Sequence, residues 1–166
     1  MAKSGGRSAR REGYCAGVES GKWKAESEEP RAESVGEPMG EGGHGQPAFR
    51  FEKLGIWQKS IEYADAVYDA TEAFPAKERF GLTSQLRRAA ASVSANIAEG
   101  SSRASDRDFS RFVEIAFGSL CESISHLCLA RRRTMVSDKD YSHLYGAAQE
   151  LSKMLSSFGN TLGQWK

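Results

Sequence analysis

The stretch YSHLYGAAQELSKMLSSFGNTLGQW, residues 141–165, carries the most regular apolar pattern in the chain. Its apolar side chains recur at alternating spacings of three and four residues. This spacing is typical of the seam of a left-handed helical bundle, where one face of each helix packs against its neighbours. We therefore expect an α-helix whose buried face consists of Tyr141, Leu144, Ala148, Leu151, Leu155, Phe158, Leu162 and Trp165.

Two similar segments indicate where the last two helices begin. Ser105-Asp-Arg-Asp108 and Ser137-Asp-Lys-Asp140 each place a capping serine ahead of acidic side chains. Carboxylates suit the first turn of a helix because the free amide groups and the helix dipole favour negative charge there. Arg131-Arg-Arg133 suits the C-terminus of the earlier of these two helices for the opposite reason.

Two further helices are expected upstream. The first runs from Leu54 to just before Phe74-Pro75, since proline disfavours a helical predecessor. The second runs from about Thr83 to Glu99, with Gly100 as the C′ residue that ends it. With no convincing strand, the sequence predicts an all-α protein, an antiparallel up-down-up-down four-helix bundle over residues 49–166. The expected apolar face of the first helix consists of Leu54, Trp57, Ile61, Ala64, Tyr68 and Thr71.

Residues 1–48 differ in composition from the rest of the chain. They contain ten of the seventeen glycines and three of the four prolines, with little aliphatic content. Such a segment buries too little apolar surface to offset the entropy of ordering it, so we expect a disordered N-terminal arm. The alternative is a start codon further downstream, with Met39 as the true first residue. A Gly-x-Gly-x-x-Gly at residues 40–45 lacks the preceding strand and following helix of a dinucleotide-binding motif and is a chance match.

The composition of the 166-residue chain also bears on its environment. A formal net charge of +1 is typical of neither a strongly basic nucleic-acid binder nor an acidic tail protein. Cys15, Cys121 and Cys128 are an odd number, and the last two share one helical face, as buried free thiols often do. No apolar run approaches the roughly 20 residues of a membrane span, and no signal peptide is evident. We therefore expect a cytoplasmic protein with no membrane partner.

Motifs for catalysis or cofactor binding are missing from the sequence. His126 and His143 lie outside the apolar stripes of their helices and belong to no His-x-x-x-His or Glu-x-x-His motif. No Gly-x-Ser-x-Gly motif, phosphate-binding loop or Cys–His arrangement occurs. Glu99 beside Asn96 could act as a base, but pairing of Glu99 with Arg88 or Arg103 of a neighbouring chain is the stronger interpretation. We predict a non-enzymatic protein with no catalytic residue, cofactor, metal site or small-molecule substrate.

A polar stripe follows one side of the second expected helix. Its side chains are mixed in character and bordered by alanines, whereas an ordinary solvated face scatters Lys and Glu. At 100° per residue they fall within about 80° of one another. We interpret the stripe as a surface that meets a partner or a second subunit at close range; the alternative is a solvated stripe beside a small-residue helix contact. The polar stripe consists of Gln85, Arg88, Ser92, Asn96, Glu99 and Arg103.

The third expected helix indicates self-association. Its apolar arc spans about 140°, which exceeds the roughly 100° that a bundle helix needs. Gly118 lies on the opposite side, where glycine costs about 1 kcal/mol relative to alanine. Close approach of another backbone would explain that glycine, and sequence drift is the alternative. We expect Gly118 and Glu122 to contact a second subunit. The arc consists of Phe109, Val113, Ala116, Phe117, Leu120, Cys121, Ile124, Leu127 and Cys128.

Arginines gather around the second helix and the start of the third. Repeated in an oligomer, Arg87, Arg107 and Arg111, together with Arg88 and Arg103 of the polar stripe, would form a charged ring. Such a ring could hold phosphates without reading bases. Residues 49–166 nevertheless carry sixteen basic and fourteen acidic side chains, a net charge of only +2. The sequence therefore predicts local phosphate contacts rather than a broadly basic surface.

An ordered series of motifs resembles a known family. Gln85-Leu-Arg-Arg-Ala, Ser92-Val, Asn96-Ile-Ala-Glu-Gly100 and Arg103 are similar to the signature of the small four-helix-bundle proteins encoded by intervening sequences of bacterial 23S rRNA genes. Flanking similarities extend from about Phe49 to the C-terminus. One departure is Ser94, where the family often has a proline.

The resemblance implies partners that the residues alone do not. Relatives look like ring-shaped homo-oligomers, often pentamers, so it implies a pentameric assembly. It also makes RNA or a ribonucleoprotein the leading partner. Some relatives serve as accessory proteins of diversity-generating retroelements and are thought to bind a reverse transcriptase and its RNA, but they are more strongly basic than this chain. A retroelement accessory subunit is therefore the second hypothesis, and a purely protein–protein scaffold is the third.

Overall fold

The computed structural model describes residues 48–163. Our expectations for the N-terminal arm, the alternative start at Met39 and the glycine motif lie outside the described residues, as does Trp165. The described chain forms four α-helices: α1 (Gly55–Glu72), α2 (Leu82–Ser101), α3 (Asp106–Arg132) and α4 (Asp138–Thr161). Two short 3-10 helices precede α1 and α2, η1 (Arg50–Lys53) and η2 (Ala76–Glu78).

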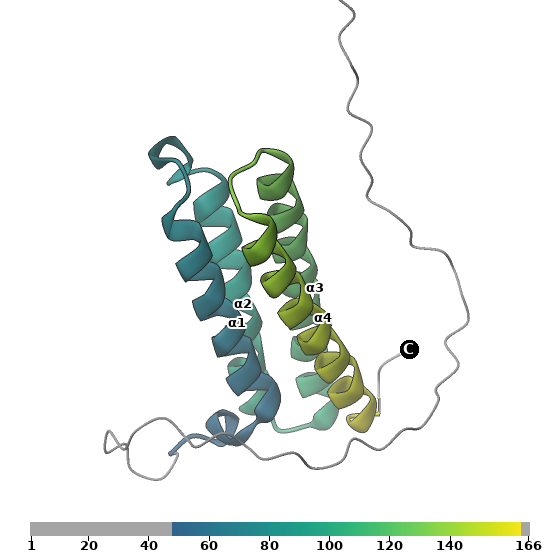
Figure 1. Cartoon of the computed structure of the whole chain (residues 1–166). Coiled ribbons are helices and arrows are strands. Elements are labelled where there is room, and N and C mark those ends of the chain that lie inside the picture. The colour runs from purple at the N-terminus through teal and green to yellow at the C-terminus, as the bar shows by residue number, and fades with distance from the viewer. Residues whose placement is uncertain (1–47, 164–166) are drawn as a thin grey trace, which may run out of the picture. The chain divides into compact units, whose positions relative to one another are not determined.

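The four helices form an up-and-down bundle (Figure 1). Each helix packs against the next one in sequence, and α1 also packs against α4, so the four helices surround one core. Short connections over residues 73–81, 102–105 and 133–137 reverse the chain between successive helices. No strand is present within residues 48–163. The structure confirms the predicted all-α four-helix bundle.

The predicted caps of α3 and α4 are confirmed. The Ser105 hydroxyl accepts a hydrogen bond from the Asp108 amide at 3.1 Å, and the Ser137 hydroxyl accepts one from the Asp140 amide at 3.0 Å. The arginine-rich end of α3 lies beside the start of α4, where the Arg131 guanidinium is 3.1 Å from an Asp138 carboxylate oxygen. Arg131 suits the C-terminus of α3 and Asp138 suits the N-terminus of α4, and their ion pair also connects the two helix ends.

The predicted seam of α4 is the buried face of that helix. Leu144, Ala148, Leu151 and Leu155 are buried in the common core. Tyr141, Phe158 and Leu162 are half-buried and pack against its edges. A regular three-and-four spacing of apolar residues therefore identified the correct face, because nearly all the side chains that α4 contributes to the core are apolar.

The apolar face predicted for α1 is wrong in part. Ile61 and Tyr68 are 42% and 44% exposed, whereas Ser60, Tyr63 and Val67 are buried. The core accepts these polar side chains because their hydroxyls are satisfied: the Ser60 hydroxyl donates to the Trp57 carbonyl at 2.6 Å. Burying a hydroxyl costs little free energy when it has a hydrogen-bond partner. The expected face of α1 follows mainly from apolar residues and so leaves out Ser60 and Tyr63.

Gly100 has a different role from the predicted C′ position. Helix α2 continues through Gly100 to Ser101, and Ser102 is its C-cap. A Cβ atom on Gly100 would lie only 2.5 Å from Cδ2 of Phe109 and 2.7 Å from Cβ of Phe112. The glycine therefore lets α2 and α3 approach closely beside these two rings. The helix is also continuous at Ser94, whose hydroxyl donates to the Ala91 carbonyl at 3.0 Å.

Two expectations for α3 require correction. The expected burial of both thiols is wrong for Cys121, which is exposed; Cys128 is half-buried, with its Sγ 3.6 Å from the Tyr141 hydroxyl. The second expectation was that no apolar segment approaches the length of a membrane span. Within residues 48–163, α3 is the one helix that is long and apolar enough to cross a membrane, by length and composition only. Core helices of soluble proteins pass the same test, and α3 contributes Val113, Leu120 and Leu127 to the bundle core.

Candidate functional site

The middle of the polar stripe belongs to the contact between α2 and α3. The Asn96 side-chain amide donates to the Ser92 carbonyl at 2.7 Å and lies 3.0 Å from the Ser92 hydroxyl. The Ser92 and Ser119 hydroxyl oxygens are 3.1 Å apart, and Ser119 is buried on α3. Ser92 and Asn96 are therefore half-buried groups that join two helices, with little surface left for a partner.

One end of the polar stripe is an ion pair within the chain. Arg103 and Glu99 form a salt bridge and hydrogen bond, and the Arg103 guanidinium lies 4.5 Å from the centre of the Phe112 ring. The sequence interpretation placed the partner of Glu99 on a neighbouring chain. In the structure the partner of Glu99 is Arg103 of the same chain. The two residues are four apart in sequence, a spacing that brings side chains together at a helix surface.

The other end of the polar stripe is open. Gln85 and Arg88 are exposed, and Arg88 takes part in no ion pair within residues 48–163. Arg88 and Glu99 are separated by about 16 Å along the α2 axis at 1.5 Å per residue. Five of the six polar residues lie on α2 and Arg103 follows its C-cap, so the polar stripe forms two distinct surfaces joined by a half-buried middle.

The predicted phosphate contacts are divided between the two halves of the bundle. The Nε group of Arg87 donates to the Thr71 hydroxyl at 2.6 Å, and its terminal nitrogen donates to the Tyr68 carbonyl at 3.1 Å. Arg87 therefore fastens α2 to α1. Arg107 and Arg111 are exposed in the first turns of α3, at the opposite end of α2. The structure does not bring the predicted arginines into one cluster.

The outer side of α3 leaves apolar surface uncovered. Ile115 is 52% exposed and Leu129 is 46% exposed. Between them, Gly118 is exposed, and a Cβ atom there would meet nothing within 4 Å. Glu122, on the same side, has a carboxylate oxygen 3.6 Å from Nε2 of His126. In the most apolar 18-residue window of α3, only 28% of the residues are buried. This side of α3 therefore leaves apolar side chains that the described bundle does not cover.

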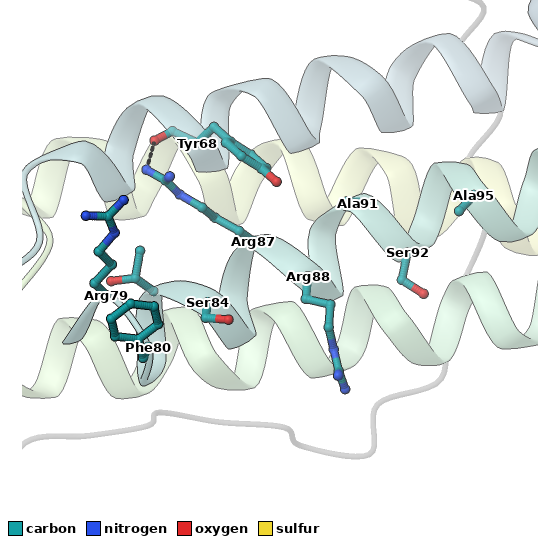
Figure 2. A pocket seen from close by; sticks show the side chains of 10 residues that line it. Tyr68, Arg79, Phe80, Ser84, Arg87, Arg88, Ala91, Ser92 and Ala95 are labelled. Carbon is teal, nitrogen blue, oxygen red and sulfur yellow. Dashed lines mark hydrogen bonds between the residues drawn. The ribbon is translucent and has the colours of Figure 1, made fainter.

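A hollow of about 760 Å³ lies between α1 and the first half of α2 (Figure 2). Arg79 and Phe80 occupy one end of it, just before α2 begins, and Phe80 is 91% exposed. Figure 2 shows Arg87 extending toward Tyr68 on α1, whereas Arg88 leaves α2 on its other side. The residues that give this hollow its chemical character are Tyr68, Arg79, Phe80, Thr83, Arg87 and Arg88.

Sequence reasoning did not identify this hollow. Three of its residues, Tyr68, Arg79 and Phe80, come from α1 and from the connection before α2, and only the fold brings them beside Arg87. The available signal was Phe80 itself, an aromatic residue between an arginine and a glycine, outside any helical apolar pattern. Elsewhere, no group of three histidine, cysteine or acidic side chains within residues 48–163 is arranged to hold a metal ion.

The helix order, the single core and the uncovered outer surfaces define an all-α up-and-down four-helix-bundle protein. The model of the 23S rRNA-intervening sequence protein family matches residues 52–157, and the chain belongs to that family. Residues 85–103, which carried the resemblance in the sequence, lie inside this match.

One solved structure shares the fold. It is a protein of unknown function from the S23 ribosomal protein family of Bacteroides thetaiotaomicron VPI-5482, with 25% sequence identity and a TM-score of 0.58. The similarity covers 61% of this chain and 95% of that chain. None of the curated proteins matches this chain.

Proposed function

We propose that this chain is a non-enzymatic, homo-oligomeric interaction module of the cytoplasm that associates with RNA. The observation that carries the proposal is the outer side of α3, where Ile115 and Leu129 are about half exposed and the surface at Gly118 is open. Apolar side chains at such exposure contribute binding energy when a second molecule covers them.

Self-association through α3 explains both the apolar surface and the glycine. Gly118 lowers the intrinsic helix propensity of α3, and nothing within residues 48–163 occupies the space that it leaves. A second subunit could bring its backbone close at this point, with Glu122 at the side of the contact. A contact between two different surfaces of identical subunits produces a closed ring when the rotation permits. A pentamer is the ring size that we propose.

RNA association rests on arginines that no carboxylate neutralises. Arg88, Arg107 and Arg111 are exposed and form no ion pair within residues 48–163. In a ring each would be repeated once per subunit, so a modest charge per chain becomes a set of evenly spaced cations. Guanidinium groups bind phosphate oxygens without regard to base sequence, and such contacts weaken as salt rises.

The proposal assigns no catalytic residue. Glu99 was the one carboxylate with a sequence argument for acting as a base, and its side chain is held by Arg103. The geometry of Glu99 therefore supports a structural role at the end of α2.

The decisive experiment is purification of the full chain, followed by light scattering and by measurement of co-purified nucleic acid as salt is raised. We expect an oligomer that carries RNA at low salt and loses it at high salt. Gly118→Leu should yield a smaller species, because the larger side chain blocks the approach of a neighbour. Gly146→Leu is the matched control, since Gly146 is an exposed helical glycine on α4 where a Cβ atom would likewise meet nothing within 4 Å.

Each alternative result has a clear meaning. A monomer at micromolar concentration would contradict the assembly. A Gly118→Leu variant of unchanged size would remove Gly118 from the subunit contact. An oligomer that binds no RNA at low salt would contradict RNA association and favour a protein–protein scaffold.

A further inference from the structure

We propose that the hollow between α1 and α2 binds one unstacked nucleotide of single-stranded RNA, with Phe80 as the surface on which the base stacks. The inference rests on the proposed RNA association and assigns it a site and a form of RNA. Three observations support it: arginines without an ion pair, an exposed aromatic ring, and a buried hydroxyl without a partner.

The charge of the hollow suits a phosphate. Arg79 and Arg87 line it near α1, and neither forms an ion pair within the described chain. Arg87 is held in place by a hydroxyl and a carbonyl, which are neutral acceptors. Its positive charge is therefore fixed in position but not cancelled, so binding a phosphate requires little additional ordering of that side chain.

Phe80 supplies a flat apolar surface that the fold does not use. It is 91% exposed, the highest exposure among the large hydrophobic side chains of residues 48–163. The Arg79 guanidinium lies 5.9 Å from the centre of the Phe80 ring. An aromatic ring beside a free cation is the usual arrangement in proteins that bind single strands, because the base stacks on the ring while the cation meets the backbone phosphate.

The start of α2 provides further groups for an anion. Thr83 is only 8% exposed, and its buried side-chain oxygen has no hydrogen-bond partner within the described residues. The N-cap residue Gly81 offers no side-chain cap, and the helix dipole favours negative charge at this end of α2. The Leu82 amide donates to Oε2 of Glu78 at 3.4 Å, and Glu78 does not line the hollow.

An unstacked nucleotide fits this arrangement better than a duplex. In a double helix the bases stack on one another and expose only their edges, so a ring such as Phe80 finds no base face. In a single strand each base can turn outward while its phosphate stays near the protein. The groups lining the hollow include no set of donors and acceptors that would favour one base, so we expect binding without sequence preference.

The test compares a labelled single-stranded RNA with a blunt-ended RNA duplex of equal length by fluorescence anisotropy, using the full chain. We expect Phe80→Leu, which keeps an apolar side chain but removes the ring, to weaken single-strand binding roughly tenfold and to leave duplex binding unchanged. Phe49→Leu is the control, since Phe49 is also an exposed phenylalanine but lies before α1 and does not line the hollow. Arg79→Gln should lower the salt dependence of single-strand binding by about one phosphate contact.

Three results would overturn the proposal, and they are distinguishable. RNA binding that is equal for both forms and indifferent to Phe80→Leu would remove the hollow but leave RNA association standing. No RNA binding by the unaltered chain at low salt would contradict both proposals. A smaller assembly for Phe80→Leu in light scattering would show that Phe80 contacts a second subunit instead.

Discussion

The hydroxyl groups of Tyr63 and Ser123 lie 2.8 Å apart in the core, and they join α1 to α3 across the diagonal of the bundle. The Ser123 hydroxyl donates to the Leu120 carbonyl at 2.8 Å, so Tyr63 is the donor in the hydrogen bond between the two side chains. Helices α1 and α3 are not neighbours in the bundle. This one buried hydrogen bond therefore links two helices whose backbones do not approach each other.

We expect this pair to show strong coupling in a double-mutant cycle. Ser123→Ala should cost about 1–3 kcal/mol of unfolding free energy because it leaves the buried Tyr63 hydroxyl without an acceptor. Tyr63→Phe should cost about 0.5–1.5 kcal/mol. The double variant should cost less than the sum, since neither unsatisfied group remains. Urea unfolding measures all three values, and simple additivity would contradict the coupling.

The same tyrosine should make the fold sensitive to alkali. Burial raises the pKa of Tyr63 above its ordinary value of 10.0. A group with a raised pKa in the folded state stabilises the protein fully below the unfolded pKa and loses that contribution as pH rises through the folded pKa. As pH is raised above 10.0, the unfolding free energy should fall more steeply for the unaltered chain than for Tyr63→Phe. Parallel curves would contradict the prediction.

Gly100→Ala should destabilise the bundle even though alanine favours helix. A methyl group at this position would lie 2.5–2.9 Å from the Phe109 ring and Cβ of Phe112, so these side chains or their helix must shift. Overpacking of this kind costs about 1–3 kcal/mol. Gly146→Ala on α4 is the control, because open space there should allow a gain of roughly 0.5–1 kcal/mol. Thermal unfolding should move in opposite directions for the two variants.

The seam of α4 should be energetically central. Leu151 and Leu155 are fully buried in the core, so changing either to alanine removes apolar contacts and leaves a cavity. Each change should cost about 2–5 kcal/mol in denaturant unfolding. A cost below about 1 kcal/mol would mean that the core collapses around the smaller side chain at that position.

The ends of the polar stripe should matter for assembly rather than for folding. Arg88 and Arg103 are exposed, so replacing both with alanine should change the melting temperature little, in line with the small contribution of surface ion pairs. If Glu99 exchanges its Arg103 partner for an arginine of the next subunit, this double variant should dissociate the oligomer, and Glu99→Ala should do the same. We expect that outcome in a light-scattering measurement.

Two other results would contradict the expected dissociation of the oligomer and give the polar stripe a different role. Unchanged size with weaker RNA binding would make the stripe a partner surface. Unchanged size, stability and binding together would leave a solvated surface with no role in recognition.

The sequence by itself determined the helices and most of their limits. The caps at Ser105 and Ser137, the stop before Phe74 and the buried face of α4 all appeared where they were predicted. These features depend on local chemistry: a serine reaches an amide three residues away, and an apolar period is set by the helix itself. Helix caps and buried faces of this kind can therefore be predicted from one short segment of sequence.

Only the tertiary structure decided which polar residues are buried and which arginines remain free. The partner of Tyr63 lies sixty residues away, and Arg87 differs from Arg88 because Thr71 of α1 is within its reach. Gly100 likewise takes its role from Phe109 and Phe112 on the next helix. A hydroxyl group, a guanidinium group or a glycine can be accommodated in several different environments. The one that each occupies depends on which distant groups the packed helices bring within contact distance.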